Sequence, residues 1–381
     1  MSSPWSSVLE GIAAPTAVID AAALRANADD LRRRSPLPIR LASKSIRVRG
    51  LLERLLGEDG FAGVLAYSAA EARWLVGHGV QDVLVAYPTV DRDTVRAVSA
   101  DPVAAEQVTF MVDLEEHVRL LAESATEHPV RVCIDVDSSL RLGPVHLGAH
   151  RSAVHSPDEV SALAAEVVRR ANLRLVGLMF YDAQVAGVPD TGRHVRLMKE
   201  RSWADLVRRR RAVREAVEQH APLEIVNAGG TGSLHRFADD GVVTDLAAGS
   251  GLFAPALFDR YDGARLRPAA FFVSPVVRKP ADDVVVTFAG GYLASGPADP
   301  SREPVVAFPE GLKPLSQEGF GEVQTPLRGP AARSMRLGDP VWFRHAKAGE
   351  MCERFDQVLL VEASGEVEPL RTYRGEGKNF G

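Results

Sequence analysis

The chain has 381 residues, of which 46% are hydrophobic and 25% are charged, with a formal net charge of −5 at pH 7 and a sequence pI of about 6.1. This length exceeds what one hydrophobic core usually supports, so we expect a globular protein of two domains. The acidic balance argues against nucleic acid or an anionic membrane as a partner, and no apolar stretch approaches the length of a membrane span.

The two cysteines, Cys133 and Cys352, are too few for a disulfide framework, and the N-terminal residues show neither the basic nor the apolar region of a signal peptide. We therefore expect a cytoplasmic protein. Four consecutive arginines, Arg208 to Arg211, lie within a long helical pattern. We interpret this run as a solvated helix face rather than as a binding patch.

Short apolar runs alternate with amphipathic segments through the first two-thirds of the chain. A β-like run at residues 16–20 comes first, and eight further runs follow it. Strands of a parallel sheet are buried on both faces and therefore read as continuous apolar runs, as these do. Eight β–α units in about 230 residues predict a (β/α)₈ TIM-type barrel over residues 21–261. The eight runs are residues 39–43, 63–67, 83–87, 108–112, 130–137, 173–180, 223–229 and 244–249.

A doubly wound open sheet is the alternative to the barrel, but the glycine fingerprint that such a fold carries for dinucleotides is missing after the first strand. From about residue 262 the helical pattern fades, and β-like runs separated by Gly/Pro turns dominate. We predict an antiparallel β domain over residues 262–381, with the run at 16–20 pairing into it.

Lys44 follows the first predicted barrel strand. It is one of only six lysines, so that of the 45 Lys+Arg residues 45 − 6 = 39 are arginine. Arginine does not lose its proton in proteins, whereas a lysine in a dry pocket becomes a nucleophile or forms a Schiff base. Lys44 is therefore a candidate catalytic residue, and a surface lysine at a strand end is the alternative.

Glycine-rich turns follow the last two predicted barrel strands. The backbone N–H groups of such turns bind phosphate, and barrels frequently place a phosphate site after strands 7 and 8. Two consecutive turns favour a phosphate site over turns that merely need glycine. The residues are Gly229, Gly230, Thr231, Gly232 and Ser233 in the first turn and Gly249, Ser250 and Gly251 in the second.

Polar side chains also follow the fifth and sixth predicted barrel strands. These include Asp135, Asp137 and Arg141. Such carboxylates and an arginine could orient a polar ligand or form a structural ion pair, and the sequence leaves both alternatives open. Tyr181, with Gln184 after it, packs against a flat cofactor ring or closes the barrel top.

In the β domain, a short segment gathers His345, Lys347, Glu350 and Cys352. A histidine near a cysteine and a glutamate suggests a metal site, although the spacing matches no closed zinc pattern. A structural histidine is the alternative interpretation.

In order and spacing, these segments resemble the fold-type III pyridoxal-phosphate enzymes, in the branch of the D-threonine aldolases and D-serine dehydratases. The resemblance runs over nearly the whole chain, through "APTAVID", "RLASKS", "IDVDSSLRLG", "GLMFYDAQ", "VNAGGTGS", "AAGSGLF", "FAGGYLASG" and "GEVQTPL…GDPVWFRHAK". It implies an alanine-racemase-like barrel with a C-terminal β domain, and a homodimer in which the β domain of one chain covers the barrel of the other.

The resemblance also implies roles for individual residues. Lys44 would hold pyridoxal 5'-phosphate as a Schiff base. Arg141 would lie near the edge of the cofactor ring and Tyr181 beside the ring or the substrate. The cofactor phosphate would be bound by Gly229, Gly230, Thr231, Gly232, Gly249 and Ser250, with Asn227 beside them.

The family places a metal pair near the end of the chain as His-x-Cys or His-x-Asp, and here the matching stretch is "HAK". His345 fits this pair, but Lys347 replaces the second ligand, and an ammonium group repels a divalent cation. We hypothesise that Lys347 supplies the positive charge itself and orients a substrate hydroxyl or carboxylate. Cys352 or Glu350 remains as the partner in an unusual metal site.

The implied activity is that of a lyase acting on a D-configured 3-hydroxy amino acid, either by retro-aldol cleavage or by dehydration with loss of ammonia. His345 is the leading acid/base candidate, because the pKa of histidine lies near neutrality. A racemase, with Tyr292 as its second base, is the first alternative. A non-catalytic pyridoxal-phosphate carrier is the second, although the β domain argues against it.

Overall fold

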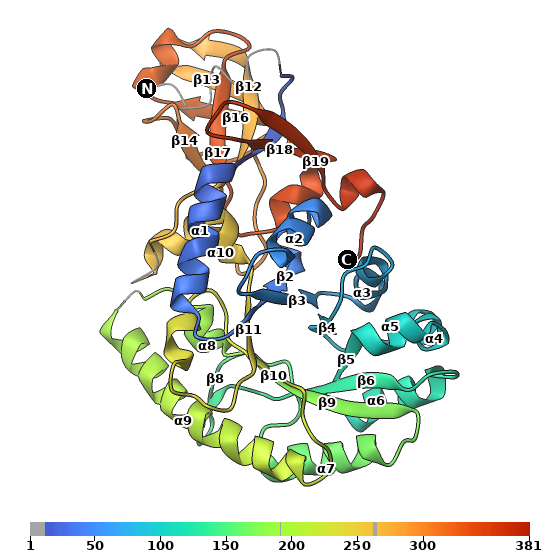
Figure 1. Cartoon of the computed structure of the whole chain (residues 1–381). Coiled ribbons are helices and arrows are strands. Elements are labelled where there is room, and N and C mark those ends of the chain that lie inside the picture. The colour runs from blue at the N-terminus through green and yellow to red at the C-terminus, as the bar shows by residue number, and fades with distance from the viewer. Residues whose placement is uncertain (1–11, 191, 262–264) are drawn as a thin grey trace. The chain divides into compact units, whose positions relative to one another are not determined.

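A computed structural model of the chain describes residues 12–190, 192–261 and 265–381 (Figure 1). The chain divides into two compact units. The barrel unit comprises Leu31–Ser43, Leu52–Gly249 and Phe380–Gly381, and the sheet unit comprises the residues up to Asp30, Lys44–Leu51 and Ser250–Asn379. Residues 1–11, on which part of the signal-peptide expectation rests, lie outside the described residues.

Eight parallel strands of the barrel unit close into a barrel in the order β10-β11-β2-β3-β4-β5-β6-β9 (Figure 1). This confirms the predicted TIM-type fold and excludes the open doubly wound sheet. Each of the eight predicted runs contains or overlaps one of these strands. The strands are β2 (Ile39–Ala42), β3 (Phe61–Ala66), β4 (Val83–Val85), β5 (Val108–Val112), β6 (Val130–Asp135), β9 (Leu173–Phe180), β10 (Ile225–Ala228) and β11 (Asp245–Ala248).

Helices connect the barrel strands, and a short hairpin that the sequence did not predict follows β6. The longest of the described helices, α9, begins at Arg193 and contains the four consecutive arginines. The helices are α1 (Ala21–Arg34), α2 (Arg49–Leu56), α3 (Ala69–Val76), α4 (Arg92–Ala100), α5 (Pro102–Gln107), α6 (Glu115–Ser124), α7 (Pro157–Val168), α8 (Ala183–Ala186) and α9 (Arg193–Glu218), and the hairpin strands are β7 (Leu140–Leu142) and β8 (Val145–Leu147).

Local sequence explains where α7 begins. The Ser156 hydroxyl accepts a hydrogen bond from the backbone N–H of Glu159, and the Glu159 carboxylate accepts one from the backbone N–H of Ser156. This capping box satisfies two N–H groups that have no partner within the helix, and Pro157 has no N–H to satisfy. Helices α7 and α9 lie side by side on the outside of the barrel strands (Figure 1).

The sheet unit contains a nine-stranded sheet with the central order β15-β16-β13-β12-β1-β18-β19, and β14 and β17 attach to it through β12. β1 pairs antiparallel with β12 and parallel with β18, and the other pairings of the sheet are antiparallel. The strands are β1 (Thr16–Asp20), β12 (Ala270–Ala281), β13 (Val284–Phe288), β14 (Val305–Phe308), β15 (Lys313–Pro314), β16 (Gln324–Arg328), β17 (Pro340–Arg344), β18 (Gln357–Val361) and β19 (Val367–Arg371).

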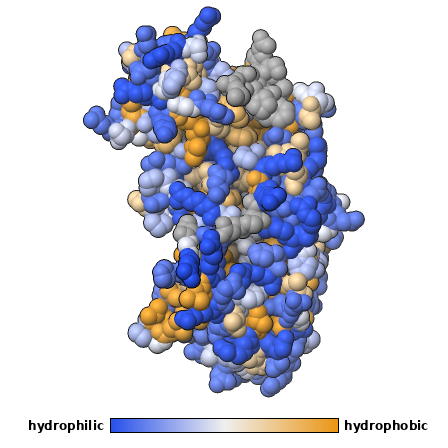
Figure 2. Space-filling model, turned by 90° about the vertical axis from the view of Figure 1, so that its left-hand side faces the viewer, coloured by the Kyte–Doolittle hydropathy of each residue, from blue (hydrophilic) through white to orange (hydrophobic). Residues whose placement is uncertain are grey.

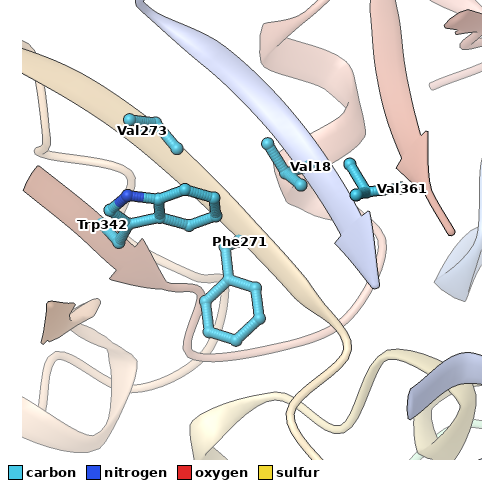
Figure 3. Close-up of a cluster of buried hydrophobic side chains, with 5 residues drawn as sticks. All are labelled: Val18, Phe271, Val273, Trp342 and Val361. Carbon is cyan, nitrogen blue, oxygen red and sulfur yellow. The ribbon is translucent and has the colours of Figure 1, made fainter. Parts of the chain in front are cut away.

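One hydrophobic cluster holds the strands of this sheet together (Figure 3). The rings of Phe271 and Trp342 meet edge to face with centroids 6.0 Å apart, a favoured arrangement of aromatic pairs. Val18 of β1 and Val361 of β18 complete the cluster with Val273. Side chains of four strands thus contribute to one core.

Hydrophilic side chains predominate on the face of the molecule drawn in Figure 2, where apolar side chains lie in small groups. Among the described residues, we find no helix that is both long enough and apolar enough to cross a membrane.

Candidate active site

Side chains that point into the barrel form layers, because side chains alternate between the two faces of a strand. One apolar layer consists of Leu84, Met111, Cys133, Met179 and Ile225. Two residues farther along their chain segments come Asp113, Asp135 and Tyr181. They therefore lie at the C-terminal rim, where the active sites of such barrels are found.

Asp135, at the end of β6, carries an unusually basic carboxylate. Burial, together with the charge of Asp113, raises the pKa of Asp135 to about 7, although the charge of Arg151 acts to lower it. Asp113 forms an ion pair with His117 at 2.8 Å and accepts a hydrogen bond from the backbone N–H of Ala153. The rim therefore carries a carboxyl group that titrates near neutral pH, as is common at active sites.

Asp137 and Arg141 form an ion pair, one of the two alternatives that the sequence left open. The distance between Arg141 Nη2 and Asp137 Oδ2 is 2.6 Å, and the Arg141 side chain remains 43% exposed. Burial of Asp137 is outweighed by hydrogen bonds from the Ser139 backbone and hydroxyl and from Arg141, so that its pKa is lowered. Asp137 is therefore ionised. It binds Nη2 of the Arg141 guanidinium, while part of the Arg141 side chain is exposed to solvent.

Tyr181 follows β9 and lies beside the first glycine-rich turn. Its Cε2 atom is 4.0 Å from where a Cβ atom on Gly230 would lie, and its hydroxyl is 3.3 Å from the corresponding position on Gly187. Burial of the hydroxyl and the charge of Asp182 raise the pKa of Tyr181 to about 12, so the phenol stays protonated. The Arg151 guanidinium lies 6.0 Å from the centre of the ring.

Within the turn Gly229–Gly232, the first two positions have little room for a side chain. Gly229 has a φ of +81°, in the left-handed region that glycine adopts without strain. A Cβ atom on Gly230 would lie 2.8 Å from the Cβ of Ala186. The Ser233 hydroxyl accepts a hydrogen bond from the N–H of Gly230, which closes the turn. Gly229 and Gly230 thus leave their backbone without a covering side chain, a feature of anion-binding turns.

Two buried side chains, Asp182 just before α8 and Gln184 within it, support this region. Burial raises the pKa of Asp182 to about 6, while the Ser233 hydroxyl and the charge of Arg210 oppose this effect. Gln184 donates a hydrogen bond to the backbone carbonyl of Ser138, at 2.6 Å. Gln184 therefore connects the segment after β9 to the segment that carries Arg141.

Asn227 belongs to a polar network inside the barrel. Its amide donates hydrogen bonds to the carboxylate and the backbone carbonyl of Asp245 on the neighbouring strand β11. Asp245 also binds Arg40, which in turn binds Asp82. These contacts account for the Asn227 side chain, whose contact with a cofactor stays a prediction.

Our interpretation of Arg208–Arg211 as a solvated helix face is wrong for two of the four residues. Arg209 is 8% exposed and Arg210 only 1% exposed. Arg210 forms an ion pair with Asp240 at 3.0 Å, and its guanidinium lies 5.0 Å from the centre of the Phe237 ring. A planar guanidinium both pairs with carboxylate and stacks on aromatic rings, so these contacts offset part of the cost of its burial.

A signal for these two arginines was present in the sequence. The buried side chains of α9 include Leu206, Val213 and Val217, which recur at helical spacing. Arg209 and Arg210 fall between Leu206 and Val213 on the same buried face, but their charge led us to assign them to the surface.

Lys44 lies in a single 3-10 turn, Ser43–Ser45, directly after β2. Within the sheet unit its backbone is held by two groups: Arg47 Nε donates a hydrogen bond to the Lys44 carbonyl at 3.1 Å, and Gly349 packs against the same carbonyl. A Cβ atom on Gly349 would collide with that oxygen, so this position requires glycine. The segment after β17 therefore fixes the backbone of the candidate catalytic lysine.

His345 follows β17 and is 3% exposed. Its Nδ1 lies 3.3 Å from the carbonyl oxygen of Ala270, which assigns the proton to Nδ1 and leaves Nε2 as an acceptor. Nε2 is buried and has no hydrogen-bond partner among the described residues. Burial lowers the pKa of His345 to about 4, so our premise of a near-neutral pKa is wrong, and the ring is neutral at pH 7.

Lys347 belongs to a polar cluster with Ser295 and Glu350. Lys347 Nζ donates to the Ser295 hydroxyl at 3.1 Å and lies 3.4 Å from the Ser295 carbonyl oxygen. The Glu350 carboxylate accepts hydrogen bonds from both the N–H and the hydroxyl of Ser295. Ser295 thus bridges the ammonium and the carboxylate, and both charges are held in place.

The remaining predicted residues of the sheet unit have separate surroundings. Burial raises the pKa of the Cys352 thiol to about 12, so it is not ionised at neutral pH. The Tyr292 ring packs against Phe272 and Phe355.

Ser250 is the first residue of α10 (Ser250–Phe253) and directly follows Gly249. Across residues 12–190, 192–261 and 265–381, no group of three or more His, Cys, Asp or Glu side chains is placed to hold a metal ion.

The predicted site residues fall into two sets. Arg141, Tyr181, Asn227, Gly229–Gly232 and Gly249 belong to the barrel unit, and Lys44, Ser250, His345, Lys347 and Cys352 belong to the sheet unit. Within the barrel unit, Tyr181 and the Gly229–Gly232 turn lie together. Within the sheet unit, the backbone of Lys44 lies against Gly349, two residues after Lys347.

The barrel unit is thus a closed parallel barrel with a glycine-rich turn after β10, and Lys44 follows β2 in the chain. Residues 19–254 match the family described as alanine racemase, N-terminal domain. This match covers more than half of the chain, and the protein belongs to that family.

Individual relatives agree with this assignment. The 3-hydroxy-D-aspartate aldolase of Paracoccus denitrificans (strain Pd 1222) is 27% identical over 226 residues, which are 58% of this chain and 54% of that protein, so the match spans about half of its length. A D-threonine aldolase of Arthrobacter sp is 24% identical over 294 residues, 72% of this chain and 71% of the relative.

Solved structures show the same fold. The D-threonine aldolase of Filomicrobium marinum superimposes with a TM-score of 0.80 at 22% identity, with 96% of each chain covered. The D-threo-3-hydroxyaspartate dehydratase of Delftia sp. HT23 gives 0.72 at 19% identity, with 96% of this chain and 98% of the other covered.

Proposed function

We propose that the protein is a pyridoxal-phosphate-dependent lyase that acts on a D-configured 3-hydroxy amino acid, by retro-aldol cleavage or by dehydration and loss of ammonia. The observation that carries this proposal is that a lysine closely follows β2 and a glycine-rich turn directly follows β10, both strands of one closed barrel. The relatives named above support it, since they are aldolases and a dehydratase of D-configured hydroxy amino acids.

The residues fit the cofactor. A phosphate needs N–H donors and close approach to the backbone. Glycine at positions 229, 230 and 232 leaves the backbone of this turn uncovered by side chains of those residues, although the N–H of Gly230 already donates to the Ser233 hydroxyl. Tyr181 lies beside the same turn and offers a protonated phenol and an aromatic face. Arg141 is half-exposed and anchored by Asp137, and thus presents a fixed positive group to a ligand.

Pyridoxal phosphate, when bound through Lys44, withdraws electrons from the bonds of the substrate Cα. The chain's own residues then decide which bond breaks. The Lys44 amine, once released, accepts or donates the proton at Cα. His345, held neutral with its proton on Nδ1, offers Nε2 as the acceptor for the proton of the substrate hydroxyl. Loss of that proton promotes retro-aldol cleavage, whereas delivery of a proton to the hydroxyl promotes dehydration.

A divalent metal does not fit the described residues. A metal-ligating histidine usually has its other nitrogen fixed by a carbonyl, as His345 has, but a second ligand is needed. The second position of the pair holds the ammonium of Lys347, which repels a cation, and the described residues contain no group of three or more His, Cys, Asp or Glu side chains placed to hold a metal ion. We infer that Lys347, positioned by Ser295 and Glu350, takes the place of a metal and attracts the substrate hydroxyl or carboxylate.

Chelation is therefore expected to leave the activity unchanged, and metal analysis should find less than one equivalent of zinc or manganese. Lys347→Ala should lower kcat/KM by about 10²-fold, the effect of removing one preorganised electrostatic group. Lys347→Asp should create a metal site with His345 and make activity sensitive to chelator. Lys313→Ala, an exposed lysine of β15, is the control. Stoichiometric metal together with loss of activity on chelation would contradict the inference.

The proposed function is tested by supplying the purified protein with pyridoxal phosphate and the D- and L-enantiomers of threonine, serine and 3-hydroxyaspartate. We expect aldehyde and glycine, or oxo acid and ammonia, from D-enantiomers only. Cα–deuterium exchange in deuterated water with recovery of the opposite enantiomer would instead indicate a racemase. Stoichiometric cofactor without turnover would indicate a carrier.

We also propose that the protein works in a reducing compartment such as the cytoplasm, as a homodimer. Both cysteines, Cys133 and Cys352, are free and buried, which supports the first of these points.

A further inference from the structure

Helix α9 carries four consecutive arginines, of which two are buried. The Arg208 side chain is 80% exposed, and Arg211 is also exposed, whereas the Arg209 side chain is 9% exposed. Burial of a charged group is costly unless hydrogen bonds compensate for the lost water. The hydrogen-bond partners of the buried Arg209 side chain therefore show which segment of the chain helix α9 holds in place.

Arg209 binds the segment that follows β6. Nη1 donates a hydrogen bond to the carbonyl of Asp137 at 2.6 Å, and Nη2 donates one to the carbonyl of Ser139 at 3.0 Å. Nε donates to the Asp205 carboxylate one turn earlier, at 3.2 Å, which orients the guanidinium. The planar fork of arginine holds two carbonyls at once, and the single ammonium of lysine does not reproduce this geometry.

The segment that Arg209 holds is the one that fixes Arg141. The Asp137 carboxylate accepts hydrogen bonds from the N–H and hydroxyl of Ser139 and from Arg141 Nη2. Arg141 itself lies on β7, a three-residue strand that, among the described residues, forms a two-stranded sheet with β8. With so little sheet around it, the position of the Arg141 guanidinium depends on Asp137, whose backbone Arg209 holds.

We propose that Arg209 is a positioning residue, which sets Arg141 in place for the cofactor by holding the carbonyls of Asp137 and Ser139. This inference rests on the proposed function in one respect, namely that Arg141 contacts bound pyridoxal phosphate. Arg209 itself touches neither cofactor nor substrate, and it acts through the Asp137–Ser139 turn.

The test compares Arg209→Lys with Arg208→Lys, two identical changes at adjacent positions of one helix. Pyridoxal phosphate is titrated into each apo-protein, and the visible spectrum of the bound cofactor is recorded. We expect Arg209→Lys to weaken cofactor binding by about 10-fold, the order expected when one charge-assisted contact is lost, and Arg208→Lys to leave it unchanged. Arg141→Ala should weaken cofactor binding similarly. The double variant Arg209→Lys/Arg141→Ala should bind the cofactor as tightly as Arg141→Ala alone, because both changes remove the same contact between Arg141 and the cofactor.

Equal cofactor binding by Arg209→Lys and Arg208→Lys would overturn the proposal, and so would additive losses in the double variant. Asp137→Asn provides a second route to the same contact that leaves α9 unaltered, and we expect it to weaken binding as Arg209→Lys does. Circular dichroism of each variant separates this effect from misfolding.

Hydrogen exchange of the backbone amides of residues 138–142, measured without cofactor, separates this inference from the proposed function. We expect Arg209→Lys to speed this exchange and Arg208→Lys not to change it, and unchanged exchange in Arg209→Lys would refute the positioning role. If the wild-type protein binds no pyridoxal phosphate, the proposed function fails, and the exchange experiment still decides whether Arg209 holds the segment that carries Arg141.

Discussion

Lys44→Arg is expected to abolish activity while leaving the fold intact. Arginine keeps the positive charge and much of the side-chain length, but its guanidinium does not lose a proton and therefore cannot form a Schiff base. Removal of a covalent catalytic group costs on the order of 10³-fold or more in kcat. The change is conservative for the backbone, since the contacts of Gly349 and Arg47 are made to the Lys44 carbonyl rather than to its side chain.

The measurement is borohydride reduction of the protein loaded with pyridoxal phosphate, followed by peptide mapping. We expect the label on the peptide that contains Lys44 in the wild type, and no label there in Lys44→Arg. Lys313→Arg, an exposed lysine of β15, should label and turn over as the wild type does. Label on a lysine other than Lys44, or full activity in Lys44→Arg, would show that Lys44 is not the cofactor lysine.

Much of the barrel was predictable because its signal is repeated. Each strand is short, apolar and followed by a helical pattern, so an error at one boundary, such as that of β3, does not change the number of units. The hairpin β7–β8 was missed because each of its strands has only three residues, too few for the alternation of a strand to be recognised.

Site residues could be predicted where the sequence itself has an unusual composition or spacing. They could not be predicted where their properties depend on tertiary contacts. A scarce lysine after a strand and glycine-rich turns mark Lys44 and Gly229–Gly232 in the sequence itself. The contacts of Arg209 and the low pKa of His345 are different, because both depend on the folded structure. Arg209 binds carbonyls that follow β6, about 70 residues earlier in the chain. The pKa of His345 is lowered by burial of its ring.

Arg40→Met is expected to cause a large loss of stability. Arg40 is 2% exposed on β2 and binds two carboxylates, that of Asp82 at 2.8 Å and that of Asp245 at 3.2 Å. Burial lowers the pKa of Arg40, but the charges of Asp245 and Asp82 outweigh this, so that it is raised and the side chain stays charged. Methionine fills similar space without charge and leaves Asp245, which is 10% exposed, without its cation.

Removal of one partner from a buried ion pair typically costs about 3–5 kcal/mol, because a buried charge is left uncompensated. We expect a shift of this size in the free energy of unfolding, seen as a lower urea midpoint by far-UV circular dichroism. Arg96→Met, which removes an exposed pair with Asp93, is the control and should cost less than about 1 kcal/mol. Arg40→Met/Asp245→Leu should recover part of the loss, because no unpaired buried carboxylate remains. Equal midpoints for Arg40→Met and Arg96→Met would show that the network inside the barrel does not stabilise the strand that leads into Lys44.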